Sequence, residues 1–277
     1  MRIDAKGDAT YILLSGISVP SKIALTEHIE LLPADTSHLD LMTAISTCSD
    51  PRDIAVVAAY IPIITAQLKI SAPRSKELAI VAWNSSWDVL ILSAVFHTEI
   101  GFNLQSDTEA SEISSESNLL ATNYNMQGLT QGSAPSLSAQ DIEWINMHFD
   151  NARKLIDNDS FQTAVHCLAS YRWHSVPRIK MAVLWAGIEG MFGASTEIRF
   201  RISLYIARFL YFDNKEACQS TFESVKKLYN SRSSAVHGSK IKGDLNSAVE
   251  DSADILRQLI LKCVSTNSLP NESELVP

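Results

Sequence analysis

The chain has 277 residues, of which 46% are hydrophobic and 19% are charged, a balance typical of globular proteins. This composition excludes global disorder, a collagen-like fibre and a heptad rod. No uninterrupted apolar run reaches the ~18–20 residues of a membrane span, and the first residues lack the apolar stretch of a secretory signal, so we expect no membrane partner. Four scattered cysteines without C-x-x-C spacing predict reduced thiols in a cytoplasmic protein.

The net charge of −8 is distributed unevenly along the chain. Residues 1–150 carry 7 Lys and Arg against 18 Asp and Glu, a balance of −11. Residues 151–242 carry 14 against 7, a balance of +7, and residues 243–277 carry 2 against 6. A basic segment inside an acidic protein indicates either a site for a polyanion or charged residues that only solvate helix faces, and charge alone does not decide between them.

The first hundred residues mix strand and helix signals. Strands are predicted over residues 10–15, 28–32 and 64–71. Asp50-Pro51 predicts the start of a helix that Pro62 ends or kinks. A long apolar-rich helix is predicted from Ser75 to His97. Together these elements predict a mixed α/β domain over residues 1–103.

A polar segment over residues 104–138 separates the two halves of the chain. It contains no Lys or Arg and is rich in Ser, Thr, Asn and Gly. A stretch of this length and composition is typical of a domain connection, a functional loop or a disordered segment. We interpret it as a loop or linker that contains one short strand near Leu119–Thr122.

Six helices are predicted in the second half, with short connections that favour antiparallel neighbours. They run from about Ser138 to Ile156, Asp159 to Trp173, Pro177 to Phe192, Thr196 to Phe212, Asn214 to Val236, and Asp244 to Val264. Gly238 is the expected stop of the fifth helix, and residues 266–277 are expected to be a frayed tail. The predicted fold is mainly α, with a C-terminal antiparallel helical bundle over residues 139–265 behind the mixed α/β N-terminal domain.

Common phosphate and metal motifs are absent from the sequence. It contains no G-x-x-x-x-G-K-[ST], no G-x-G-x-x-G after a strand, no G-x-S-x-G and no H-E-x-x-H. His166, Cys167 and His174 are close in sequence, but the two histidines are eight residues apart, so core packing is favoured over a zinc site. The sequence therefore predicts neither a metal nor a cofactor.

Two charged residues interrupt apolar helix stripes. Arg232 follows Phe222, Val225 and Leu228 in the fifth helix, and Glu189 lies among Met181, Trp185, Ile188 and Phe192 in the third. A buried charge is costly unless it is paired, so we expect Glu189 to hold Arg232, or else Arg199 or Arg201. The alternatives are that Arg232 extends to solvent over its apolar stem and that Glu189 is exposed at a helix edge.

His237 closes the fifth helix five residues after Arg232. Five residues turn a helix by about 140° beyond one full turn, so the two side chains cannot share one face of a straight helix. Either the chain turns at His237, or the two residues act with their copies in a second protomer. A proton-transferring imidazole and a fixed cation are the groups that RNA cleavage by its own 2′-hydroxyl requires. A match to any of the spacings R-x4-H to R-x6-H is expected about once by chance, so the context of this one decides its meaning.

That context resembles the ApeA-like branch of the HEPN superfamily. The resemblance lies in Trp185-Ala-Gly-Ile-Glu-Gly-Met-Phe-Gly193, in the segment from Glu197 to Arg208, and in Tyr229-Asn-Ser-Arg-Ser-Ser-Ala-Val-His-Gly238. It implies a helical bundle that dimerises and a metal-independent endoribonuclease of toxin–antitoxin or antiviral defence systems. It also implies that Arg232 and His237 are catalytic and that RNA, a second copy of the chain, and an antitoxin or defence protein are the partners.

The resemblance assigns supporting roles to further residues. Ser233 follows the arginine where the family often has Asn, Asp or His, Glu189 is the orienting acid, and Tyr229 lies beside the motif. The candidate phosphate and RNA contacts are the basic residues Arg199, Arg201, Lys226 and Lys240. Two alternatives stay open: a catalytically silent HEPN module that binds a nucleotide or a partner protein, and a sensor subunit whose acidic N-terminal half recognises an invader or an antitoxin.

Overall fold

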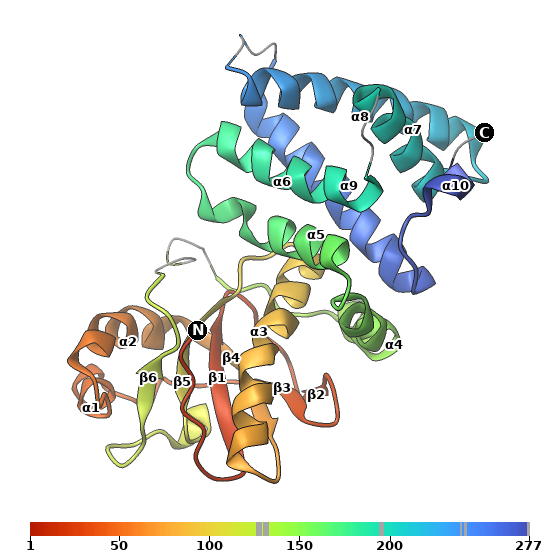
Figure 1. Cartoon of the computed structure of the whole chain (residues 1–277). Coiled ribbons are helices and arrows are strands. Elements are labelled where there is room, and N and C mark those ends of the chain that lie inside the picture. The colour runs from red at the N-terminus through yellow and green to blue at the C-terminus, as the bar shows by residue number, and fades with distance from the viewer. Residues whose placement is uncertain (126–128, 130–132, 194–196, 239, 241–242, 276–277) are drawn as a thin grey trace. The chain divides into compact units, whose positions relative to one another are not determined.

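The computed structural model describes residues 1–125, 129, 133–193, 197–238, 240 and 243–275. The chain forms two compact units, Met1–Asp150 and Asn151–Pro277, and the division falls within helix α4 (Ala139–Leu155). Figure 1 shows the strands in the first unit and helices α5 to α10 in the second.

The first unit is built on a six-stranded antiparallel sheet. Its strands are β1 (Ala9–Ser15), β2 (Ile23–Ala24), β3 (Ile29–Pro33), β4 (Ile64–Ser71), β5 (Gly101–Ser106) and β6 (Leu119–Ala121), in the order β2-β3-β4-β1-β5-β6. The central strand β1 pairs Ile12 with Leu68 on β4 and Leu13 with Leu104 on β5. The strands predicted over 10–15, 28–32, 64–71 and near Leu119 are thus confirmed.

Strand β5 was not predicted, although its apolar residues Phe102 and Leu104 alternate with polar ones in the pattern of a strand. Asn103 and Gln105 are polar residues that the sheet buries, at 5% and 2% exposure. The Asn103 amide donates to Asn123 Oδ1 at 2.8 Å, and the Gln105 amide donates to Thr10 Oγ1 at 2.6 Å. Contacts distant in sequence satisfy these amides, so the strand buries its polar residues as well as Leu104. Much of segment 104–138 therefore lies within the first unit as β5, 3-10 helix η3 (Ala110–Glu112) and β6.

Helices cover both faces of the sheet. Leu13 packs in a cluster with Val57 and Tyr60 of α2 (Ile54–Tyr60), beside α1 (Leu41–Ser46). Side chains alternate along a strand, so the fully buried Ile12 and Leu14 point to the opposite face, where α3 (Ser75–Phe96) contacts β1 and β4. The α3 helix has the length and hydropathy, 1.5, of a membrane span, but 61% of that apolar window is buried, as expected for a core helix.

The second unit is a packed helical region. Its helices are α5 (Asp159–Ser170), α6 (Pro177–Phe192), α7 (Ile198–Tyr211), α8 (Lys215–Val236), α9 (Leu245–Thr266) and α10 (Glu272–Leu275), with 3-10 helix η4 (Tyr171–Trp173) after α5. Together with α4, the helices from α5 to α9 match the six predicted ones, although the expected start at Thr196 lies outside the described residues. The predicted fold class is confirmed: an N-terminal sheet with helices is followed by a C-terminal helical region.

Helix α6 lies at the centre of this unit and contacts α5, α8 and α9. Gly187 makes this close packing feasible. A methyl group at Gly187 would lie 3.0 Å from Cys167 Cβ on α5 and 3.1 Å from Leu256 Cδ2 on α9. The glycine in the Ala-Gly-Ile-Glu-Gly run therefore allows three helices to meet, and Trp185 and Ile188 are buried at 1% and 0% exposure beside it.

The C-terminal segment packs against α7, whereas the sequence predicts a frayed tail over residues 266–277. Arg208 Nη1 donates to the Leu275 carbonyl at 2.8 Å, and the Tyr205 hydroxyl donates to Glu272 Oε1 at 2.6 Å. The Leu275 side chain is 5% exposed. One apolar side chain and long-range hydrogen bonds from α7 thus order residues up to 275, while 276–277 lie outside the described residues.

Candidate functional site

The two residues of the R-x4-H pattern lie at the C-terminal end of α8. Asn214 caps the start of this helix, where its side chain accepts a hydrogen bond from the Ala217 amide at 3.0 Å. At the other end the His237 amide bonds the Ser233 carbonyl at 3.0 Å, and Gly238 takes a left-handed φ of +72°. Gly238 therefore ends the helix as predicted, because a residue without a side chain adopts this conformation without strain.

Helix α8 is mostly polar, and only Val225 and Ala235 along it are buried. Its inner side packs on α6, where the Tyr229 ring meets the Trp185 ring edge-to-face at 5.3 Å between centroids. Trp185 Nε1 in turn donates to Ser252 Oγ on α9 at 3.1 Å. Tyr229 therefore anchors the segment that carries the arginine to the core of the unit.

The predicted pairing of Arg232 with Glu189 is confirmed. Arg232 Nη2 lies 2.9 Å from Glu189 Oε2, and the side chains are 20% and 26% exposed. The guanidinium also lies 5.6 Å from the centre of the Tyr229 ring. The other two candidate partners have different contacts: Arg199 Nη1 donates to Asn230 Oδ1 at 3.3 Å, and Arg201 Nη1 to Glu272 Oε1 at 3.1 Å.

The Glu189–Arg232 pair leaves hydrogen-bonding capacity unused. Glu189 Oε1 and Arg232 Nε are buried and have no hydrogen-bond partner among the described residues. Burial raises the pKa of Glu189, and the neighbouring Arg232 only partly opposes that shift. The carboxylate is thus held at a cost of desolvation, which its ion pair with Arg232 offsets only in part.

We expect Glu189→Ala to lower the free energy of unfolding by about 1–3 kcal/mol, because it leaves a half-buried guanidinium without its charged acceptor. The value is below the roughly 3–5 kcal/mol of a fully buried broken pair, since both side chains retain some contact with water. Denaturant unfolding followed by circular dichroism measures it. Glu189→Gln, which keeps an acceptor of the same shape, is the control and should lose less. Equal stability of wild type and Glu189→Ala would show that the pair contributes nothing.

His237 lies on a different side of α8 from Arg232, as the spacing predicts. Its side chain is exposed and makes no hydrogen bond or ion pair with any described residue. Arg232 faces α6, whereas His237 follows about 140° further around the helix axis. Within one chain the described contacts therefore do not bring the imidazole and the guanidinium together.

Arg178 is a residue of this region that the sequence analysis missed. It lies in the first turn of α6, and its Nη1 donates to the Ser234 and Ala235 carbonyls, both at 2.9 Å. These carbonyls belong to the last turn of α8, immediately before His237. A cation there complements the negative end of the helix dipole and fixes the backbone that carries the histidine. An arginine in another helix has no local signal for this role.

The remaining predicted site residues are spread along α7 and α8. Lys226 lies 3.9 Å from Glu223 and 5.4 Å from the centre of the Phe222 ring. Ser233 is half-buried, and Lys240 is exposed beyond the helix. The structure thus groups Glu189, Tyr229 and Arg232, places Arg199 and Lys226 along the α7–α8 edge, and turns Arg201 toward α10.

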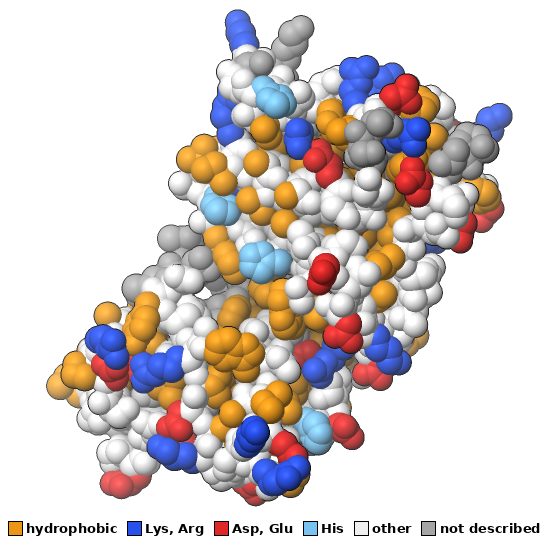
Figure 2. All heavy atoms as spheres, in the orientation of Figure 1, with side chains coloured by type: hydrophobic (Ala, Val, Ile, Leu, Met, Phe, Trp, Pro, Cys, Tyr) orange, Lys and Arg blue, Asp and Glu red, His pale blue; other side chains and the backbone are white. Residues whose placement is uncertain are grey.

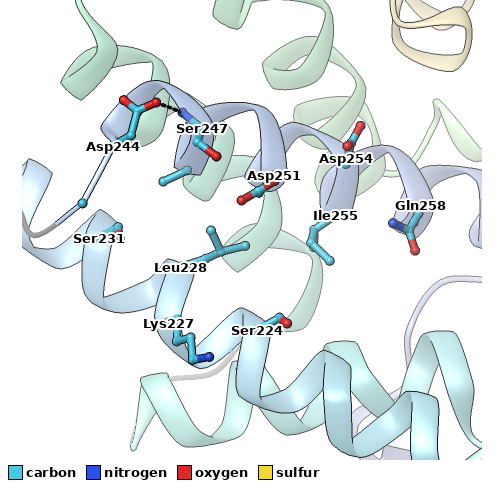
Figure 3. Close-up of a pocket in the computed structure, with 12 residues that line it drawn as sticks. Ser224, Lys227, Leu228, Ser231, Asp244, Ser247, Asp251, Asp254, Ile255 and Gln258 are labelled. Carbon is cyan, nitrogen blue, oxygen red and sulfur yellow. Dashed lines mark hydrogen bonds between the residues drawn. The ribbon is translucent and has the colours of Figure 1, made fainter.

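A groove of about 580 Å³ lies between α8 and α9. Figure 3 shows Lys227 and Leu228 on the α8 side and Asp251, Asp254 and Ile255 on the α9 side. Together with Asp244, the groove carries three carboxylates against one lysine, so it repels a polyanion. The hollow between these helices is therefore not the surface that an RNA backbone would use.

The candidate zinc ligands are not gathered into a site. His166 packs edge-to-face on Trp173 with ring centroids 5.8 Å apart, and Cys167 is buried against Gly187. Burial lowers the pKa of His166 and raises that of Cys167, which keeps both neutral. Over the part of the chain that the structure describes, no three His, Cys, Asp or Glu side chains form a group able to hold a metal ion.

Comparison of this chain with protein-family models, with curated proteins and with solved structures gives no match.

Proposed function

We propose that this protein is an endoribonuclease that cleaves RNA with Arg232 and His237, and that it serves a defence or toxin-type system in the cytoplasm. The observation that carries the proposal is the pair of functional groups at the end of α8. Glu189 holds the Arg232 guanidinium at 2.9 Å, and His237 is exposed where the helix ends. The basic balance of residues 151–242 supports a polyanionic substrate.

The reaction that suits these groups is attack of a ribose 2′-hydroxyl on the adjacent phosphate. The His237 imidazole takes the 2′-hydroxyl proton as the new O–P bond forms, and the resulting imidazolium gives a proton to the 5′-oxygen as its bond to phosphorus breaks. The products are a cyclic phosphate, which water opens to a 3′-phosphate, and a 5′-hydroxyl. Arg232 stabilises the negative charge that develops on the phosphorane, and Glu189 orients the guanidinium.

The separation of Arg232 and His237 around α8 supports a composite site made by two chains. A two-fold homodimer with both α8 ends at its axis would place the arginine of one protomer beside the histidine of the other. Exposed apolar side chains near this end of α8 support such a contact: Val236 is 45% exposed, and Val176 and Ile179, which flank Arg178, are each 46% exposed.

We expect light scattering at micromolar concentration to give the mass of a dimer. Val236→Asp should convert the protein to a monomer, because a two-fold contact brings both copies of the new charge into an apolar interface. Lys227→Asp, on the groove side of the same helix, is the control and should leave the dimer intact. A monomeric wild type would contradict the composite site.

We expect RNA cleavage to persist in excess EDTA, because the proposed chemistry uses an imidazole and a guanidinium and assigns no step to a divalent ion. The measurement is the rate of cleavage of a labelled RNA with EDTA, and with EDTA followed by excess magnesium. Loss of cleavage in EDTA that magnesium restores would show that a metal carries the reaction.

A catalytically silent module that binds a nucleotide or a partner protein is the second candidate. One observation favours it: within the described chain no side chain holds the His237 ring, whereas an acid–base histidine is usually oriented by a hydrogen bond. Binding without cleavage of any RNA by the wild-type dimer would support this second function.

A further inference from the structure

Two phenylalanine rings form a pair at the surface of the helical unit. The ring centroids of Phe200 on α7 and Phe222 on α8 lie 5.7 Å apart with an interplanar angle of 76°. Phe200 is 53% exposed, so much of one ring faces water. The hydrophobic effect favours covering such a pair, which makes it a candidate for contact with a ligand.

One cationic side chain lies beside the aromatic pair, and a second is next to Phe200 in the sequence. Lys226 Nζ lies 5.4 Å from the centre of the Phe222 ring, and Arg199, next to Phe200, reaches Asn230 at 3.3 Å. Glu223 is the acidic neighbour, 3.9 Å from Lys226. Residues 197–238 carry seven Lys and Arg against four Asp and Glu. Figure 2 shows basic, acidic and hydrophobic side chains intermixed over the region where Figure 1 places α7 and α8.

The aromatic pair and His237 lie along one face of α8. At 100° per residue, Phe222, Lys226, Ser233 and His237 fall within about 60° of one another around the helix axis. His237 follows Phe222 by fifteen positions, which is about 22 Å along the helix axis. This face, called here the Phe222–His237 track, therefore leads from the aromatic pair to the proposed acid–base residue.

The acidic groove occupies the opposite face of the same helix. Its α8 residues Ser224, Lys227, Leu228 and Ser231 are centred about 160° away from the Phe222–His237 track. Two adjacent lysines therefore have different surroundings: Lys226 lies beside the aromatic pair, and Lys227 faces the aspartates of α9. The two faces of α8 differ in charge, and only the track is suited to a polyanion.

We infer that the Phe222–His237 track binds single-stranded RNA, with bases stacked on Phe200 and Phe222 and phosphates at Lys226 and Arg199. Aromatic rings interleaved with cations are the general means of holding a strand with unpaired bases. A duplex does not offer such bases, because they are already stacked and paired. The inference rests on the proposed function and specifies its substrate: RNA whose bases are unpaired on one side of the cleaved bond.

The test is binding of a labelled oligouridine of about twelve nucleotides to the full chain, followed by fluorescence anisotropy. The chain carries His237→Ala throughout, so that the RNA stays intact. We expect Phe200→Leu, which keeps an apolar side chain but removes the ring, to weaken binding about tenfold. Phe200→Trp should restore it. Phe212→Leu is the matched control, since Phe212 is 65% exposed at the C-terminal end of α7, and it should bind as the parent does.

A second experiment measures the salt dependence of oligouridine binding for variants of the adjacent residues Lys226 and Lys227. Lys226→Ala should reduce the slope of log affinity against log salt by about one, because a phosphate contact is lost, whereas Lys227→Ala should leave the slope nearly unchanged. A blunt RNA duplex of the same length should bind more weakly and show no dependence on Phe200.

The outcomes separate this inference from the proposed function. Equal oligouridine binding by Phe200→Leu and its parent would overturn the track even if wild type cleaves RNA. Loss of binding in Phe200→Leu, restored by Phe200→Trp, would support the track even if wild type cleaves nothing. Tighter binding of the duplex, with the same dependence on Phe200, would overturn the assignment to single strands.

Discussion

His237→Ala should reduce RNA cleavage by about 10²–10⁴-fold while changing RNA affinity by no more than a few-fold. The imidazole contributes through proton transfer, which has no counterpart in ground-state binding. Arg232→Ala should lower cleavage and also weaken binding, with a salt slope smaller by about one, because a guanidinium facing phosphate acts in both the ground and the transition state. Single-turnover cleavage and anisotropy binding of the same RNA measure the two effects separately.

Cleavage by His237→Ala and Arg232→Ala can be compared with wild type only if both variants remain folded and dimeric. Arg232 forms an ion pair with Glu189 and lies over Tyr229, so its removal also affects packing. Arg232→Lys, which keeps a charge but not the planar fork, separates the two contributions. His174→Ala is the control for His237, since it removes another histidine of the same unit and should cleave as wild type does. If His237→Ala and Arg232→Ala both cleave as fast as wild type, the R-x4-H pattern is a chance match and the ribonuclease proposal is wrong.

Mixing two inactive variants should restore cleavage if the site is shared between chains. A dimer of one Arg232→Ala chain and one His237→Ala chain has one site that lacks both groups and one that has both. Tandem purification isolates the mixed dimers, each of which has one complete site of two, so recovery to about half of wild-type activity is expected. Co-expression of the two variants with different affinity tags, followed by tandem purification and a cleavage assay, measures it.

Each variant co-expressed with itself is the control and should stay inactive. The assay must also show that mixed dimers form, which the two tags report directly. If purified mixed dimers are as inactive as the parents, the pairing of one chain's Arg232 with the other chain's His237 is wrong. A site within one chain would then require the end of α8 to turn, because the described contacts keep the two side chains on different faces.

Much of the helical unit could be predicted from the sequence because its signals are local. Asn214 and Asp244 cap the starts of α8 and α9, and Gly238 ends α8, each through contacts with residues a few positions away. The pairing of Glu189 with Arg232 was also predictable, since each is a single charge on an apolar stripe and such charges need a partner. The apolar stripes do not show which side of α8 is left uncovered by neighbouring helices.

Tertiary contacts decided the features that no local pattern reports. The buried amides of Asn103 and Gln105 on strand β5 find their acceptors in distant segments. Arg178 caps a helix end 56 residues further along the chain, and residues up to Leu275 are ordered by an arginine 67 residues earlier. The meeting of Phe200 with Phe222 likewise depends on how α7 and α8 pack. The sequence by itself thus determined which segments are helical and which charges need partners, because propensity, capping and periodicity act over a few residues. Only the tertiary structure decided which of those residues meet, because packing brings together side chains that are far apart in the sequence, and such contacts produce no repeating sequence pattern.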